Sequence, residues 1–237
     1  MGFAIGLLIF GAALWLLYRL KARDVANCRA VLDLALADGR ADRGTTPEGF
    51  AYDQRALLQG TMLGRPAVLW SRTVRHPRFA AGKRRSSEFT VLEFTLPQPV
   101  RGPLRLQPAG VLGALEGLLR EPAGDLVAID PVFDAAYVVH ARPETGVLLI
   151  LDPARREQLL AFRARMAGEL PASSAAGRLS SGLVLGTFQL HGSTASYTLF
   201  GSPVQATAEH VKAAAPLLLD LAAAAGFGGD DALRHVP

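Results

Sequence analysis

The feature that most constrains this chain is an uncharged apolar run near its start. It covers residues 3–18 (FAIGLLIFGAALWLLY) and is followed at once by Arg19, Lys21 and Arg23. At about 1.5 Å per residue, a helix over the uncharged residues 2–18 is roughly 26 Å long, slightly less than a ~30 Å hydrocarbon core. The run therefore predicts a single transmembrane helix over residues 1–20, crossing with little tilt.

The flanking residues predict the orientation of this helix. Trp15 and Tyr18 lie near its end, where their rings favour the headgroup layer, and Lys and Arg directly after a span favour a cytoplasmic C-terminus. The positive charges follow the run instead of preceding it, and no A-x-A site follows closely, which disfavours a cleaved signal peptide. We therefore expect a single-pass protein of the cell inner membrane with a cytoplasmic C-terminal domain.

Length and composition predict one globular domain after the anchor. The chain has 237 residues, so roughly 190 to 200 remain for globular structure, enough for one sizeable core. A single cysteine, Cys28, excludes an intramolecular disulfide framework and fits a reducing compartment. We expect a transmembrane anchor at 1–20, a juxtamembrane helix and linker at 21–49, a cytoplasmic domain at 50–228 and a flexible tail at 229–237.

Local patterns predict an α+β fold for that domain. Residues 56–62 and 67–74 flank a Gly-Arg-Pro turn and indicate a hairpin, and SEFTVLEFTL at 87–96 is the clearest strand. Asp152 and Pro153 are typical of an N-cap and first position, so they predict a helix from Pro153 to Met166. We expect a mostly antiparallel sheet with helices, ending in a long C-terminal helix over about 204–225.

Motifs of known chemistry are absent from the sequence. It contains no G-x-S-x-G elbow, no phosphate-binding G-x-x-x-x-G-K-[ST] loop and no closely spaced histidine pair, and it has one cysteine. We therefore expect no metal site and no cofactor. The net charge of +4 is mild, and aromatic residues are scarce among the basic ones, so nucleic acid is not an expected partner.

An acidic group offers one catalytic alternative. Asp125, Asp130 and Asp134 lie within ten positions of one another. Paired carboxylates can do acid/base work or hold a metal, although Asp is also favoured in turns, where its carboxylate accepts from nearby backbone N–H groups. The alternative function is therefore a membrane-tethered enzyme that uses Asp130 and Asp134.

A basic group gives the leading functional hypothesis. Between two predicted strands lie six cationic side chains that are candidates for lipid binding: Arg72, Arg75, Arg78, Lys83, Arg84 and Arg85. Anionic headgroups attract such charges by about 1 kcal/mol each near the surface, whereas a solvated loop is the plain alternative. We expect a membrane-anchored, non-catalytic protein whose cytoplasmic domain binds a partner protein or an anionic lipid surface.

One segment carries a resemblance to a family. Phe133, Asp134, Tyr137 and Val139 match the pattern F-D-x-x-[FY]-x-V, and a helix follows from Arg155. In these features the chain resembles bacterial membrane-anchored proteins of unknown function. The resemblance covers about residues 50–226 and implies a shared α+β domain with a long C-terminal helix. It implies no catalytic residues.

Overall fold

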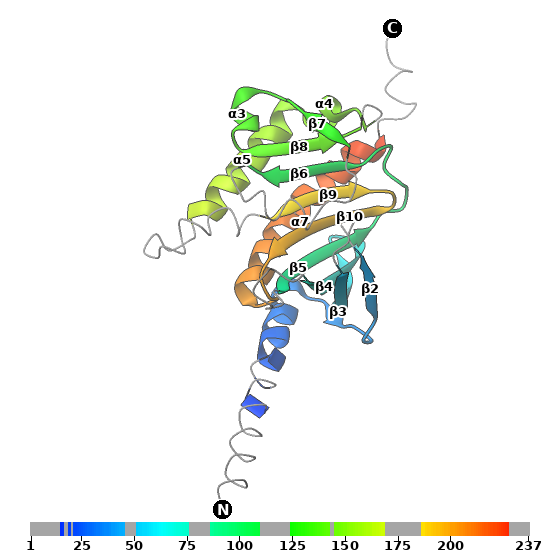
Figure 1. Ribbon diagram of the computed structural model, residues 1–237, viewed down its shortest axis with the longest axis vertical. Helices are drawn as coiled ribbons and strands as arrows, with labels where there is room; N and C mark the ends of the chain where they lie inside the picture. Colours follow the sequence, from blue (N-terminus) through cyan, green and yellow to red (C-terminus); the bar gives the residue numbers. More distant parts are fainter. Residues whose placement is uncertain are drawn as a thin grey trace, which may run out of the picture.

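The computed structural model describes residues 15–16, 19, 21–45, 51–75, 86–109, 124–142, 145–168 and 186–227. Within them, ten strands form one antiparallel sheet, and helices pack against one of its faces (Figure 1). A helix over residues 21–32 comes first. The labelled elements that follow are β1 (Ala35–Leu36), β2 (Ala41–Thr45), β3 (Ala51–Met62), β4 (Arg65–Arg75), β5 (Ser86–Thr95), β6 (Leu104–Pro108), β7 (Asp125–Val127), α3 (Pro131–Asp134), β8 (Tyr137–Ala141), α4 (Val147–Ile150), α5 (Pro153–Gly168), β9 (Thr187–His191), β10 (Thr194–Phe200) and α7 (Gln205–Phe227).

The strands follow the order β1-β3-β4-β5-β10-β9-β6-β8-β7, and β2 also pairs with β3. Both β1 and β2 lie on the edge of β3 that β4 leaves free, because Ala35 opposes Gln59 and Ala41 opposes Arg55. They therefore act as one interrupted edge strand. The sheet twists strongly, so that β3 and β4 run steeply across the direction of β6 and β8 (Figure 1).

One face of the sheet carries the main core. A continuous row of side chains crosses five strands on this face: Leu92, Tyr197, Phe188, Leu106 and Val139. Each is at most 1% exposed. Helix α7 packs on β10 and β5, and α5 packs on α7. Because side chains alternate along a strand, the neighbouring residues point to the opposite face, away from the described helices. We call that opposite face the far face. In Figure 1 it is turned toward the viewer, with α7 behind the sheet.

Two predicted elements have the expected local causes. The β3–β4 hairpin turns at Leu63 and Gly64, which both have positive φ, 53° and 74°, as a tight two-residue hairpin requires. Helix α5 begins at Pro153 after Asp152, whose Oδ1 accepts the N–H of Arg155 at 2.8 Å. The hairpin and this helix are therefore confirmed.

The first described helix joins the same core. Cys28 and Leu32 are buried in it, and Lys212 on α7 donates from Nζ to the carbonyl oxygen of Val31 at 2.8 Å. Burial, with a smaller contribution from Asp24, raises the pKa of the Cys28 thiol to about 11. The thiol is therefore a packed core group.

The predicted transmembrane helix is contradicted. Among the described residues, no helix is long and apolar enough to cross a membrane, so the description as a single-pass membrane protein is wrong on this finding. The longest described helix, α7, carries Glu209, Lys212 and Asp220 and packs its apolar side on the sheet. Most of the apolar run at 3–18 lies outside the described residues. The inner-membrane location rested on this run and stays an untested prediction.

Other differences are local. Residues 38–49 were expected to be a linker, but 41–45 form β2, which pairs with 51–55 of β3. Residues 147–150, whose pattern fits either a strand or a helix, form the helix α4. The sequence also predicts a short helix at 111–120 and a strand at 178–185, and both segments lie outside the described residues.

Candidate binding site on the far face of the sheet

The predicted basic group is only partly described. Arg72 and Arg75 lie on β4, three positions apart, and therefore point to opposite faces of the sheet. Arg75 forms an ion pair with Asp53, which also pairs with Arg43, whereas Arg72 binds Gln54 on the far face. Arg78, Lys83, Arg84 and Arg85 lie outside the described residues. Lipid binding by this group stays a prediction.

The acidic group has structural contacts. Asp130 caps α3 by accepting the N–H groups of Val132 and Phe133 at 3.0 and 2.9 Å, and it forms an ion pair with Arg156. The N–H of Phe133 and the Arg156 guanidinium hold the pKa of Asp130 below its usual value. The carboxylate of Asp134 accepts the N–H of Ile129 at 3.0 Å. These bonds explain both carboxylates without catalysis.

The remaining member of the acidic group, Asp125, is exposed on β7 opposite Ala141. Among the described residues, no three His, Cys, Asp or Glu side chains are placed to hold a metal ion together. The described contacts of Asp130 and Asp134 are therefore structural ones.

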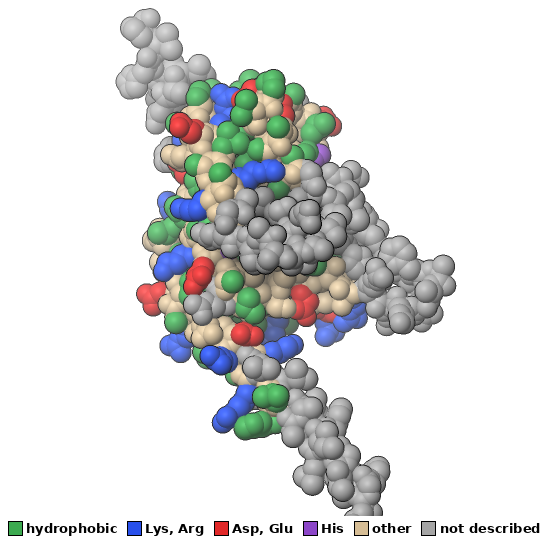
Figure 2. Space-filling model, turned by 90° about the vertical axis from the view of Figure 1, so that its left-hand side faces the viewer, with side chains coloured by type: hydrophobic (Ala, Val, Ile, Leu, Met, Phe, Trp, Pro, Cys, Tyr) green, Lys and Arg blue, Asp and Glu red, His purple; other side chains and the backbone are tan. Residues whose placement is uncertain are grey.

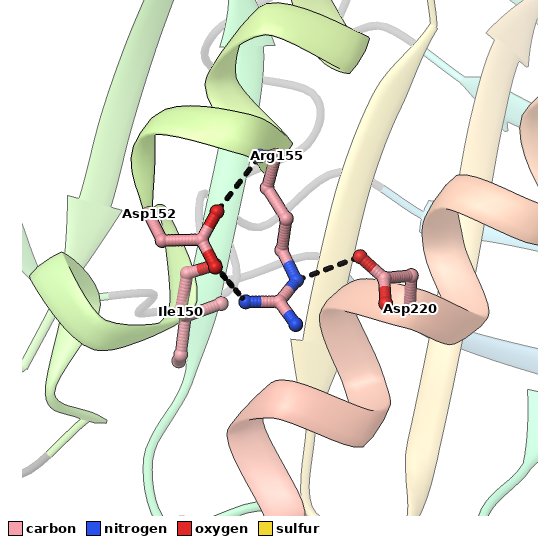
Figure 3. Close-up of polar contacts among 4 residues, drawn as sticks. All are labelled: Ile150, Asp152, Arg155 and Asp220. Carbon is pink, nitrogen blue, oxygen red and sulfur yellow. Dashed lines mark hydrogen bonds and ion pairs between the residues drawn. The ribbon is translucent and has the colours of Figure 1, made fainter.

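A second ionic cluster joins two helices (Figure 3). Arg155 on α5 donates from Nε to Asp220 on α7 at 2.6 Å and from Nη1 to Asp152 at 2.7 Å. Its Nη1 also lies 3.3 Å from the carbonyl oxygen of Ile150. Because Asp152 is itself the helix cap, this cluster fixes the start of α5 against α7. We call it the α5–α7 clamp.

The far face is different in character near β3, β4 and β5. There, aromatic side chains from four strands gather with two arginines. The set is Tyr52, Trp70, Phe89, Phe200, Arg40 and Arg72, and we call it the aromatic corner. The strand register places Gln54, Arg72, Phe89 and Phe200 in one row across the sheet, and Ala56, Trp70, Val91 and Thr198 in the next.

The arginines of the corner are positioned by their neighbours. The Arg72 Nε donates to Oε1 of Gln54 at 2.8 Å, and the Gln54 amide donates to Asp42 at 3.2 Å. The Arg72 guanidinium lies 5.3 Å from the centre of the Tyr52 ring, and that of Arg40 lies 5.1 Å from the Trp70 ring. Both distances fall within the range of cation–π contacts. The cations are therefore held against aromatic surfaces.

One buried donor in the corner has no partner. Trp70 is 1% exposed, and within the described part of the chain its Nε1 has no hydrogen-bond acceptor. Indole nitrogen can only donate, and buried polar groups are nearly always paired in native proteins. The Trp70 N–H is thus a sign of a missing acceptor in the aromatic corner.

A row of polar side chains continues beyond the corner. It crosses β5, β10, β9, β6 and β8 on the far face through Glu93, Ser196, Gln189, Arg105 and His140. Arg105 is only 2% exposed. This polar row carries one guanidinium and one carboxylate, so it is nearly balanced in charge, unlike the aromatic corner.

On the core face, one polar pair is buried. Tyr197 Oη on β10 lies 2.8 Å from Nε2 of His210 on α7 and accepts the N–H of Gly186 at 2.9 Å. Burial, together with the nearby charge of Arg165, lowers the pKa of His210 to about 4, so the imidazole is neutral at pH 7 and shares a hydrogen bond with the Tyr197 hydroxyl. A Cβ at Gly186 would lie 2.4 Å from Cζ of Tyr197, so only glycine allows this approach.

The β7 end of the sheet exposes large apolar side chains. Leu126 on β7, Val132 on α3, and Leu148 and Leu149 on α4 are between 65% and 78% exposed. These three elements all lie at the upper end of the molecule in Figure 1, and Figure 2 shows hydrophobic side chains on the surface of that end. Leu126 opposes His140 and therefore points to the far face, whereas α4 packs on α7. We call the four residues the apolar cap.

Comparison with known proteins adds no relative: no family model, curated protein or solved structure matches the chain. The resemblance to membrane-anchored proteins therefore rests on its motif alone. In the structure, the motif residues pack locally. The ring of Phe133 stacks on Tyr137 with 5.2 Å between centres, and the Tyr137 hydroxyl donates to the carbonyl oxygen of Leu159 at 3.0 Å. The pattern therefore describes a packed corner of the core.

Proposed function

We propose that this chain is a non-catalytic binding protein that docks a partner protein on the apolar cap. The observation that carries the proposal is the exposure of Leu126, Val132, Leu148 and Leu149 at one end of the sheet. Single exposed apolar residues are ordinary, but several large ones at one end of a molecule, two of them adjacent as Leu148 and Leu149 are, are typical of interaction sites.

The local structure explains why these side chains are presented to solvent. Helix α4 is one turn long, and Ile150 is its buried contact, so Leu148 and Leu149 project away from the core. Likewise, α3 buries Phe133 and leaves Val132 outside. Each short helix is thus held by a buried residue, Ile150 or Phe133, while Leu148, Leu149 and Val132 remain exposed to a partner.

The acidic residues give no competing support for catalysis. Asp130 accepts backbone N–H groups in the first turn of α3, Asp134 accepts that of Ile129 just before this helix, and Arg156 compensates the charge of Asp130. A general acid or base needs a carboxylate that can reach a substrate. Partner binding therefore explains more of the described features at this end of the molecule than catalysis does.

Site-specific photo-cross-linking in the native cell tests this proposal. A photoreactive residue replaces Leu149 in the full chain, and a second variant carries it at Leu63, which is equally apolar, 60% exposed and placed on the β3–β4 turn. We expect one discrete cross-linked protein from position 149 only. It should disappear when Leu148 is changed to Asp.

Equal labelling from positions 149 and 63, or a cross-link that survives Leu148→Asp, would refute docking at the apolar cap. Circular dichroism and a thermal melt of the Leu148→Asp variant serve as the folding control, because this side chain is exposed and its replacement should leave the core intact.

A further inference from the structure

The buried Trp70 N–H defines one contact of a second site, at the other end of the sheet. An indole N–H placed out of water without an acceptor costs about 1 to 3 kcal/mol. Its neighbours across the strands, Ala56 and Val91, are apolar and supply none. A bound molecule with an oxygen at this point would remove that cost.

The charges around Trp70 specify what kind of oxygen fits. Arg40 and Arg72 bring two guanidinium groups to the aromatic corner, and Asp42 reaches it through Gln54. Glu93 lies on the same face, two positions beyond Val91. Arg72 follows Trp70 by two positions on the same face of β4, so their Cα atoms are about 7 Å apart. A carboxylate or phosphate has two or more oxygens and can accept from both side chains.

The surrounding rings specify the rest of the molecule. Phe89 and Phe200 meet edge to face, with 5.6 Å between ring centres and an angle of 87° between planes. Phe200 remains 38% exposed, and it lies next to Phe89 in the row that also contains Arg72. An apolar group that extends from the anion would cover this exposed ring.

We propose that the aromatic corner binds an amphipathic organic anion, a carboxylate or phosphate carried on an apolar body. The acidic oxygens accept from Trp70 Nε1 and from the Arg72 guanidinium, while the body packs on the exposed ring of Phe200. The site is separate from the apolar cap in both position and chemistry. Either proposal can therefore fail without the other.

Isothermal titration calorimetry of the full chain tests the anion requirement. Decanoate and decyl phosphate are the two anionic probes, and decyltrimethylammonium is the control with the same tail and the opposite charge. We expect saturable binding of at least one anion and none of the cation. Preference between the two anions then shows whether the site suits a carboxylate or a phosphate. Equal affinity for anion and cation would overturn the proposal.

Two arginine variants test the position. Arg72→Gln removes a charge on the far face, and Arg75→Gln removes the same charge three positions away on the opposite face. We expect at least a tenfold loss of affinity for the preferred anion in the first variant and unchanged affinity in the second. Equal losses in both would mean that the anion responds to general charge and not to this corner.

Trp70→Phe separates ligand binding from packing. The change keeps an apolar ring but deletes the N–H, so we expect several-fold weaker anion binding. Because this N–H has no acceptor among the described residues, its deletion should not by itself lower the melting temperature. Because Trp70 is buried, a smaller side chain can also lower the stability through lost packing. Trp70→Leu, which likewise lacks the N–H, is melted in parallel to measure that packing loss. Unchanged affinity in a folded Trp70→Phe variant would refute the role of the indole donor.

Discussion

The two faces of the same sheet follow different rules. On the core face, the row from Leu92 to Val139 is mostly apolar and is covered by α7. The polar side chains there, Tyr197 and His210, are hydrogen-bonded to each other. On the far face, the corner holds arginines against rings and leaves the Trp70 N–H without an acceptor among the described residues. The first face is organised for stability, and the second retains polar groups that a ligand can use.

The largest expected contrast between the faces comes from two phenylalanines. Phe188 is 1% exposed on the core face, whereas Phe200 is partly exposed on the far face. We expect Phe188→Ala to lower the free energy of unfolding by about 3 to 5 kcal/mol and Phe200→Ala by about 1 kcal/mol or less. Urea denaturation measures both, and similar losses would remove the distinction.

Acid should weaken the core face through His210. Its pKa is about 4 in the folded chain and 6.5 as the ordinary value, so the unfolded chain takes up the proton first as the pH falls. The stabilisation is therefore complete above about pH 6.5 and is lost between there and about pH 4, with a slope of up to about 1.4 kcal/mol per pH unit.

Urea denaturation between pH 7 and pH 4 measures this loss of stability. His210→Gln is the control, because the glutamine side chain can accept a hydrogen bond from the Tyr197 hydroxyl but does not titrate. The difference in stability between the two proteins should shrink as the pH falls. A constant difference would show that His210 does not carry the acid sensitivity.

The smallest expected effect concerns the α5–α7 clamp. Asp152→Ala removes both the helix cap and one ion pair, so we expect a loss of about 1 to 2 kcal/mol. Asp220→Ala removes only a partly exposed ion pair and should cost less than about 1 kcal/mol. Thermal melts of the two variants measure which substitution destabilises the protein more. A larger loss for Asp220→Ala would mean that the ion pair with α7 contributes most of the clamp's stabilisation.

Much of the fold could be predicted from local pattern. Leu92 and Phe94 alternate with Glu93, which identifies β5, and the Asp152-Pro153 pair identifies the start of α5. In contrast, β2 reads ADRGT, a polar edge sequence without alternation, so nothing local distinguishes it from a linker. The pairing of β5 with β10 joins segments far apart in the chain, and no local signal encodes it.

The site was harder to predict because its residues come from separate strands. Spacing alone indicates that Arg72 and Arg75 point to opposite faces, since side chains alternate along a strand. That Arg72 meets Phe89 and Phe200 depends on the register between β4, β5 and β10. Trp70 reads simply as a core residue in the sequence, and its unpaired N–H becomes visible only when its neighbours are placed.

The central position of β10 has a consequence for how the chain is made. Strands β3, β4 and β5 can pair as soon as they leave the ribosome, but the second edge of β5 is completed only by residues 194–200. Such long-range pairing slows folding and leaves a strand edge exposed in the meantime. A nascent chain that stops before residue 200 would keep this edge unprotected and be prone to aggregate.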